Sequence, residues 1–184
     1  RAAQPAAEKL GVGLYGANGH QLAPATLADH PHARLVAVAG LRATTTLPEG
    51  VTRHASLEAL LADPTVALVS LCSPRRADQA RDAIRCLEAG KHVFCEKPPA
   101  LSAKEMAVMK LTAEKAKKTL MFNFNNRARP ESYAMMDYVQ SGAIGTINTC
   151  QAKWIRRAGI PGFGGWFTTK TLSGGGPMID LLHM

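Results

Sequence analysis

The chain has 184 residues, of which 46% are hydrophobic and 20% are charged, a balance that excludes global disorder and allows one domain, or one domain and part of a second. Lysine and arginine total 22 against 14 acids, a formal charge of +8, which indicates either a basic surface or attraction for an anionic ligand such as a phosphate-bearing cofactor. Because only 5% of the residues are aromatic and the bases are scattered, we expect no nucleic acid partner.

Over the first two thirds of the chain, apolar runs predict strands that alternate with helices. The expected strands are 12–15, 34–39, 66–72, 92–95 and 120–124, and the expected helices between them are 21–29, 56–63, 78–89 and 102–118. Such alternation is typical of βαβ units and a parallel sheet. We therefore predict an α/β fold with a doubly wound Rossmann sheet, which forms a dinucleotide-binding domain over residues 10–125.

The pattern changes in the last third of the chain. A helix is expected over 130–140, and the polar and apolar alternation of 146–157 predicts an antiparallel strand buried on one face. A glycine-rich loop over 158–176 then leads to a helix that begins at Pro177. We predict that residues 126–184 begin an α+β substrate and oligomerisation domain and do not complete it.

The four cysteines, Cys72, Cys86, Cys95 and Cys150, show neither a CxxC motif nor Cys/His metal spacing. We therefore predict free thiols and no metal site. Free thiols are typical of a reducing compartment. No run approaches the ~20 apolar residues that span a bilayer, so we expect a cytoplasmic protein without membrane contact.

An open parallel sheet binds ligands at the carboxyl ends of its strands, so the residues that follow each strand are the candidate contacts. After the first strand, GANGHQ keeps the first glycine of the G-x-G-x-x-G fingerprint as Gly16, places Asn18 at the second glycine position and adds Gly19 beside it. Asn tolerates positive φ. These three residues predict a turn that binds the pyrophosphate of a dinucleotide; an ordinary strand-to-helix turn is the alternative.

The position after the second strand discriminates between the two nicotinamide cofactors. NAD binders usually place an acid there that binds the ribose 2′-hydroxyl, whereas this chain has Gly40, followed by Arg42. No carboxylate repels a 2′-phosphate here, and a guanidinium can pair with one. The sequence favours NADP, without excluding NAD; the alternative is that Arg42 is a solvated loop base.

Two further segments follow strands. After the third strand, Ser73 and Pro74 are expected to line the nicotinamide side, and Arg75 or Arg76 to reach a phosphate.

After the fourth strand, Glu96 and Lys97 precede two prolines. Pro98 fixes the backbone so that the Lys97 amine stays in place, as a proton donor or carbonyl polariser requires. We expect a rigid Lys97–Pro98 bond, in the trans or the cis form, with Glu96 holding the lysine or contacting the ribose. The alternative is a surface Glu–Lys pair before a proline turn.

Four motifs resemble the Gfo/Idh/MocA oxidoreductases: AGKHVFCEKP at 89–98, RARPE at 127–131, SGAIGTI at 141–147 and GGGPMIDLLHM at 174–184. The resemblance covers nearly the whole chain. It implies NAD(P)-dependent oxidation of a sugar or cyclitol hydroxyl, or the reverse reduction. It also implies Lys97, Asp180 and His183 as catalytic residues, with Arg127 of RARPE among the cofactor contacts. His183 follows Asp180 by three residues where the family has four, a spacing that keeps one helix face.

In the implied mechanism, His183 takes the hydroxyl proton, Asp180 orients the imidazole and Lys97 stabilises the developing alkoxide. Members of this family are roughly twice as long as this chain and assemble through the second domain, so a homo-oligomer with a small, sugar-like substrate is expected. The alternative is a non-catalytic regulator that senses a nucleotide or sugar with the same fold. Retention of the three catalytic residues favours the enzyme.

Overall fold

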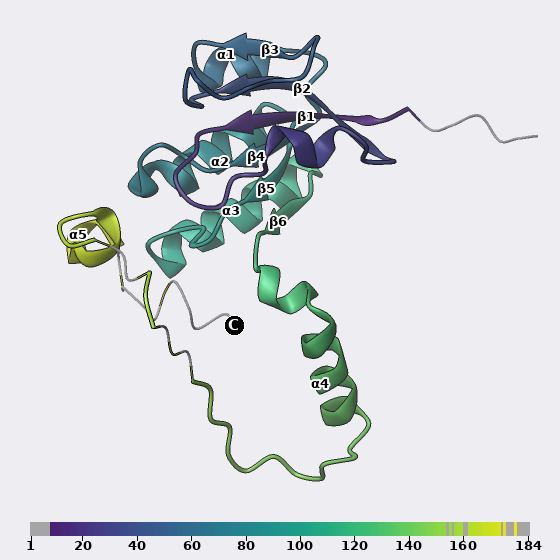
Figure 1. Ribbon diagram of the computed structural model, residues 1–184, viewed down its shortest axis with the longest axis vertical. Coiled ribbons are helices and arrows are strands. Elements are labelled where there is room, and N and C mark those ends of the chain that lie inside the picture. Colours follow the sequence, from purple (N-terminus) through teal and green to yellow (C-terminus); the bar gives the residue numbers. More distant parts are fainter. Residues whose placement is uncertain are drawn as a thin grey trace, which may run out of the picture. The chain divides into compact units, whose positions relative to one another are not determined.

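A computed structural model describes residues 8–153, 155, 157–159, 162–173, 175 and 179. Contacts between residues divide the chain into two units, residues 1–123 and 124–184. All the strands among the described residues belong to the first unit (Figure 1). The assignment of 10–125 as a dinucleotide-binding domain and of 126–184 as the start of a substrate domain stays a prediction.

Six parallel strands form the sheet of the first unit, in the order β3-β2-β1-β4-β5-β6. Their bounds are Leu10–Tyr15 (β1), Ala33–Ala39 (β2), Thr52–His54 (β3), Leu68–Leu71 (β4), His92–Cys95 (β5) and Leu120–Phe122 (β6). The strand order reverses between β1 and β4, which is the switch point of a Rossmann fold. The predicted doubly wound sheet is confirmed.

Two differences from the predicted elements lie in the first unit. The strand β3 is missed by the sequence analysis because its three residues, Thr-Arg-His, carry no apolar alternation. The helix predicted over 21–29 is wrong, since only one 3-10 turn, η1 at Pro24–Leu27, forms there. Pro24 occupies the first helical position after an extended Ala23, and β2 begins again at Ala33, so the chain has no room for an α-helix.

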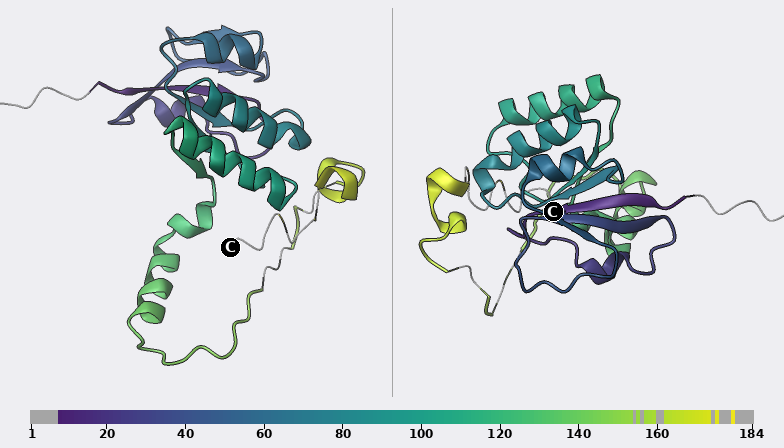
Figure 2. Two further views of the ribbon diagram at one scale, coloured as in Figure 1. Left: turned by 180° about the vertical axis from the view of Figure 1, so that it is seen from behind. Right: turned by 90° about the horizontal axis from the view of Figure 1, so that it is seen from above.

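Three α-helices cover one face of the sheet (Figure 2, right). They are Leu57–Ala62 (α1), Gln79–Glu88 (α2) and Ala103–Ala116 (α3), and a 3-10 turn at Arg76–Asp78 (η2) leads into α2. Serine side chains cap two of these helices at their N-termini: Ser56 Oγ accepts the Ala59 N–H, and Ser102 Oγ accepts the Glu105 N–H, each at 3.2 Å. None of the described helices has the length and apolar character needed to cross a bilayer.

The main core lies between these helices and the sheet. Leu60 of α1, Leu71 of β4, Leu87 of α2 and Met109 of α3 have no exposed surface. Burying each such side chain contributes about 1.5–3 kcal/mol to the free energy of folding. The packing between the three helices and this face therefore stabilises the sheet.

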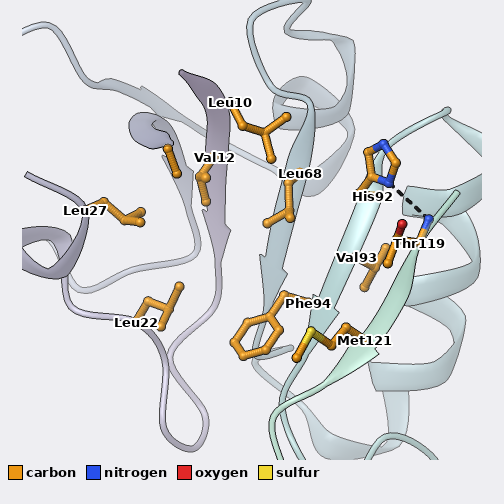
Figure 3. A pocket seen from close by; sticks show the side chains of 11 residues that line it. Leu10, Val12, Leu22, Leu27, Leu68, His92, Val93, Phe94, Thr119 and Met121 are labelled. Carbon is orange, nitrogen blue, oxygen red and sulfur yellow. Dashed lines mark hydrogen bonds between the residues drawn. The ribbon is translucent and has the colours of Figure 1, made fainter. Parts of the chain in front are cut away.

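The opposite face of the sheet is covered by η1 and the residues just before it. Leu22 and Leu27 pack there against Val12, beside an apolar hollow of about 220 Å³ (Figure 3). The hollow reaches Leu68 and His92, the first residues of β4 and β5. It therefore extends to the amino ends of the strands, away from the edge where the sequence places the cofactor.

The second unit contains helices and irregular segments in its described part: Asn125–Ala128 (η3), Pro130–Gln140 (α4), Trp166–Thr168 (η4) and Lys170–Ser173 (α5). The helix predicted over 130–140 is confirmed. The strand predicted over 146–157 is wrong: its described residues form no strand and are all exposed. No other described segment of this unit is a strand, so the described part of the unit offers this segment no strand to pair with. The helix predicted from Pro177 lies, except for Ile179, outside the described residues.

The burial of the cysteines predicts selective alkylation. Cys72, Cys86 and Cys95 are buried and Cys150 is exposed, all with free thiols. Burial raises the pKa of Cys72 to about 12 and that of Cys95 to about 12, so the reactive thiolate is scarce at both. We expect iodoacetamide near pH 8 (about the ordinary thiol pKa) to label Cys150 alone in the folded protein. Intact mass measures this, with Cys150→Ser as the unlabelled control; a second fast label would contradict the burial.

Candidate functional site

Gly16 turns the chain at the carboxyl end of β1. Its φ is +71°, and its N–H donates to the Ala39 carbonyl at 2.9 Å. A Cβ at this position would lie 2.0 Å from the carbonyl oxygen of Cys72, just after β4. Glycine is therefore required where the ends of β1 and β4 meet, which is where the fingerprint places its first glycine.

Gly40 stands at the end of β2, in the place of the acid that many NAD binders carry. Its φ is +66°, and a Cβ there would lie 3.3 Å from the backbone nitrogen of Gly16. Left-handed backbone is unfavourable for residues with a side chain. The geometry therefore disfavours an acid at position 40, in agreement with the sequence.

Gln21 ties the Gly16 turn to the sheet. Its Nε2 lies 3.0–3.1 Å from the carbonyl oxygens of Tyr15, Gly16 and Ser70, and its Oε1 accepts from Ser70 Oγ at 2.6 Å. The fingerprint uses a third glycine here so that a helix can pack closely. This chain has no such helix, and an amide side chain fixes the turn instead. In the sequence, only the replacement of the third fingerprint glycine by Gln21 pointed to this role.

Asn18 and Gly19 contact the segments that follow β4 and β5. The Asn18 carbonyl accepts from Arg76 Nη2 at 2.6 Å, and Asn18 Nδ2 donates to the Pro74 carbonyl at 3.3 Å. A Cβ on Gly19 would come within 3.0 Å of the side chains of Arg76 and Glu96. Arg76, which is 4% exposed, thus brings a buried positive charge against the turn.

Ser73 and Arg75 make contacts within the protein. Ser73 Oγ donates to Asp82 Oδ2 at 2.8 Å, and Arg75 Nε donates to Asp78 Oδ2 at 2.7 Å on the surface. The Arg75–Asp78 pair raises the pKa of Arg75 and lowers that of Asp78. The contacts of Ser73, Pro74 and Arg75 with a cofactor stay predictions.

Gln79 links the chain after β4 to the chain after β5, and the sequence analysis missed it. Its Oε1 accepts the Ser73 N–H at 2.8 Å, and its Nε2 donates to the Glu96 carbonyl at 2.7 Å. The side chain is fully buried. It therefore fixes the peptide group that joins Glu96 to Lys97.

The Glu96 carboxylate holds the turn from the other side. It is 2% exposed; Oε1 accepts the His20 N–H at 3.3 Å and lies 3.1 Å from His20 Nδ1, while Oε2 accepts from Asn123 Nδ2 at 2.8 Å. A buried carboxylate is tolerated only when it is hydrogen-bonded. Glu96 therefore joins the ends of β5 and β6 to the turn after β1.

Lys97 comes next, at the carboxyl edge of the sheet. Its side chain is half-buried, and its bond to Pro98 is cis, one of the two forms expected. The residue before it, Glu96, contacts His20. The backbone that carries Lys97 is therefore tied to the turn over 16–20.

The structure does not place three further predicted site residues relative to these. Asp180 and His183 lie outside the described residues, so their convergence with Lys97 stays a prediction. Arg127 belongs to the second unit, where its guanidinium lies 5.5 Å above the Phe124 ring.

The donor set at this edge fits a dinucleotide. Within the described residues, the backbone N–H groups of Ala17 and Gly19 donate to no protein acceptor, and the exposed Arg42 forms no ion pair. Amide groups in a tight turn and a nearby guanidinium are typical ligands of phosphate.

Residues 10–124 match the sequence profile of the oxidoreductase family with an NAD-binding Rossmann fold, GFO_IDH_MocA.

The chain belongs to the Gfo/Idh/MocA oxidoreductase family. It is 42% identical over 118 residues to D-glucoside 3-dehydrogenase of Escherichia coli, which covers 64% of this chain and 33% of that protein. It is 30% identical over 126 residues to levoglucosan dehydrogenase of Pseudarthrobacter phenanthrenivorans, with 66% of this chain and 32% of that protein covered.

Among solved structures, the crystal structure of an NAD-binding protein from Listeria innocua superposes with a TM-score of 0.77 and 25% identity, over 95% of this chain and 52% of that one. This Gfo/Idh/MocA chain thus spans about a third of the length of the two dehydrogenases and about half of the crystallised protein. The resemblance seen in the sequence is confirmed, and so is the Rossmann fold.

Proposed function

We propose that this chain is the cofactor-binding part of an oxidoreductase that transfers a hydride between NADP and a hydroxyl or carbonyl carbon of a sugar or cyclitol. The observation that carries the proposal is the contact of Glu96, the residue before Lys97, with His20 of the turn after β1. Membership of an NAD-binding oxidoreductase family supports it. The names of the relatives, a D-glucoside 3-dehydrogenase and a levoglucosan dehydrogenase, support a sugar as the substrate.

In this proposal each residue has one task. The cofactor, when bound, supplies the hydride chemistry. The Lys97 ammonium stabilises negative charge that develops on the substrate oxygen. His183 accepts the hydroxyl proton, and Asp180 orients that ring. Glu96, Gln79 and Arg76 keep the turn and the lysine in register, so that the reacting groups need no rearrangement.

The reaction is tested by assaying a full-length form of the protein, with the substrate domain complete, for NADP reduction on D-glucosides, levoglucosan and inositols. Turnover on one of these classes, stronger with NADP than with NAD, supports the proposal. Cofactor binding without turnover on any sugar or cyclitol would favour the sensing role instead.

The cofactor preference yields a separate prediction. We expect Arg42→Ala to weaken NADPH binding by about tenfold, since a hydrogen bond between charged groups contributes about 1.5–3 kcal/mol, and to leave NADH binding unchanged. Titration of both reduced cofactors by fluorescence measures this. Tighter binding of NADH to the unmodified protein, or an NADPH preference that is not reduced in Arg42→Ala, would contradict it.

The proposal also includes a cytoplasmic homo-oligomer. Free thiols fit a reducing compartment. In the second unit, the exposed Tyr133, Met135 and Met136 of α4 fit burial against another chain.

A further inference from the structure

The connection from β2 to β3 is a loop over residues 40–51 that contains no helix. Leu41, Leu47 and Val51 pack onto the core cluster that includes Val38 of β2. Between the first two of these anchors the loop carries Arg42 and three consecutive threonines, 44–46. The loop is therefore fixed at both ends, and its polar stretch follows directly on the end of β2.

Arg53, in the middle of β3, binds the polar stretch of this loop. Its Nη2 donates to the Thr45 carbonyl at 3.1 Å, and its Nη1 donates more weakly to the Arg42 carbonyl at 3.4 Å. The guanidinium group thus reaches the loop beside the carboxyl end of β2.

The register of β3 explains this direction. Arg53 is aligned with Val38 of β2, about 4.8 Å away in a parallel sheet, so both side chains share a face. The next residue, His54, points to the other face, where its Nε2 lies 2.9 Å from Asp63 Oδ2. Arg53 is therefore directed to the face on which the loop runs.

The positive charge at this place is not neutralised. Among the described residues, neither Arg42 nor Arg53 lies within ion-pair distance of a carboxylate. The one acid of the loop, Glu49, forms no ion pair in this part of the chain either. A guanidinium has five N–H donors, and the two carbonyl contacts leave Arg53 with donors for a ligand.

We propose that Arg53 determines specificity for NADP: together with Arg42 it binds the 2′-phosphate of the adenosine ribose. This inference rests on the NADP preference of the proposed function and adds a residue from the next strand. A guanidinium on the strand beside the loop adds a second positive charge and more N–H donors for a phosphate than the exposed Arg42 offers by itself. Gly40, at the end of β2, places no carboxylate beside these two arginines.

The test is binding to the full chain of three probes: NADPH, NADH and 2′,5′-ADP. In Arg53→Gln we expect NADPH and 2′,5′-ADP to bind about 10- to 100-fold more weakly, with NADH affinity unchanged. Arg53→Lys keeps the positive charge but loses the forked donors of the guanidinium. Its affinity for NADPH is expected to lie between those of the unmodified chain and of Arg53→Gln. Arg34→Gln is the matched control, because it removes an exposed arginine from the amino end of β2. It should leave the ratio of NADPH affinity to NADH affinity unchanged.

Three outcomes would overturn the inference. An equal loss of NADH and NADPH affinity in Arg53→Gln would show that Arg53 only supports the fold. An NADPH preference that persists in Arg53→Gln but is lost in Arg42→Ala would leave the proposed function intact and remove Arg53 from the phosphate site. A preference of the unmodified chain for NADH would refute NADP specificity and this inference together, while sugar turnover would remain to be judged by the assay. Thermal unfolding of each variant verifies that it is folded.

Discussion

Replacing Lys97 with alanine in a full-length form of the protein is expected to lower kcat by about 10²- to 10⁴-fold, the usual contribution of a positioned acid or base. The lysine lies at the carboxyl edge of the sheet, next to a Glu96 that is held by His20 and Asn123. Its loss removes the positive charge that opposes the developing alkoxide. Because the turn after β1 is fixed by other side chains, the affinity for NADPH should change far less than turnover.

The controls separate chemistry from folding. Lys104→Ala removes an exposed lysine from the first turn of α3 and should leave kcat unchanged. Asp180→Ala should lower turnover as Lys97→Ala does if the two residues serve one centre. Near-normal turnover in Lys97→Ala would refute the proposed mechanism and favour the sensing role. Steady-state kinetics together with cofactor titration distinguishes these results.

Gly16→Ala is expected to reduce the free energy of unfolding by about 3–5 kcal/mol, in the upper range for single substitutions. Two effects combine in that loss. The left-handed backbone costs a residue with a side chain about 1–2 kcal/mol. The new methyl group would also lie 2.0 Å from the Cys72 carbonyl, so the ends of β1 and β4 must separate.

Gly50→Ala is the matched control for this effect. Gly50 has φ +79°, and a Cβ at this position would meet no other atom within 4 Å, so the variant should lose only the backbone contribution of about 1–2 kcal/mol. Urea denaturation of both variants gives the difference. Equal losses in the two variants would show that the contact between the new methyl group and the Cys72 carbonyl adds nothing to the destabilisation by Gly16→Ala.

Much of the first unit was predictable because its strands are continuous apolar runs and its helices have caps that sequence spacing reveals. Ser56 and Ser102 directly precede helices, and each side chain accepts an N–H of the first helical turn, as serine commonly does there. The errors occurred where tertiary context decides. β3 is too short and polar to show a period, and the segment over 21–29 has helical composition but is interrupted by Pro24 and held by Gln21.

The site was predictable only in part. Gly16, Glu96 and Lys97 follow strands, so topology alone places them at one edge. The contacts of Glu96 with His20 and Asn123 join segments that are far apart in sequence, and no local spacing announces them. Gln79 and the buried Arg76 were missed as structural members of the site for the same reason.

Within the described residues, the sheet ends at both edges in strands of only three residues, β3 and β6. An edge strand presents unpaired N–H and C=O groups, which invite a strand of another chain. Three residues offer too few of these groups to hold a partner in a stable ladder. The parallel sheet of this family member is thereby protected from edge-to-edge aggregation without needing charged or proline gatekeepers along a long exposed strand.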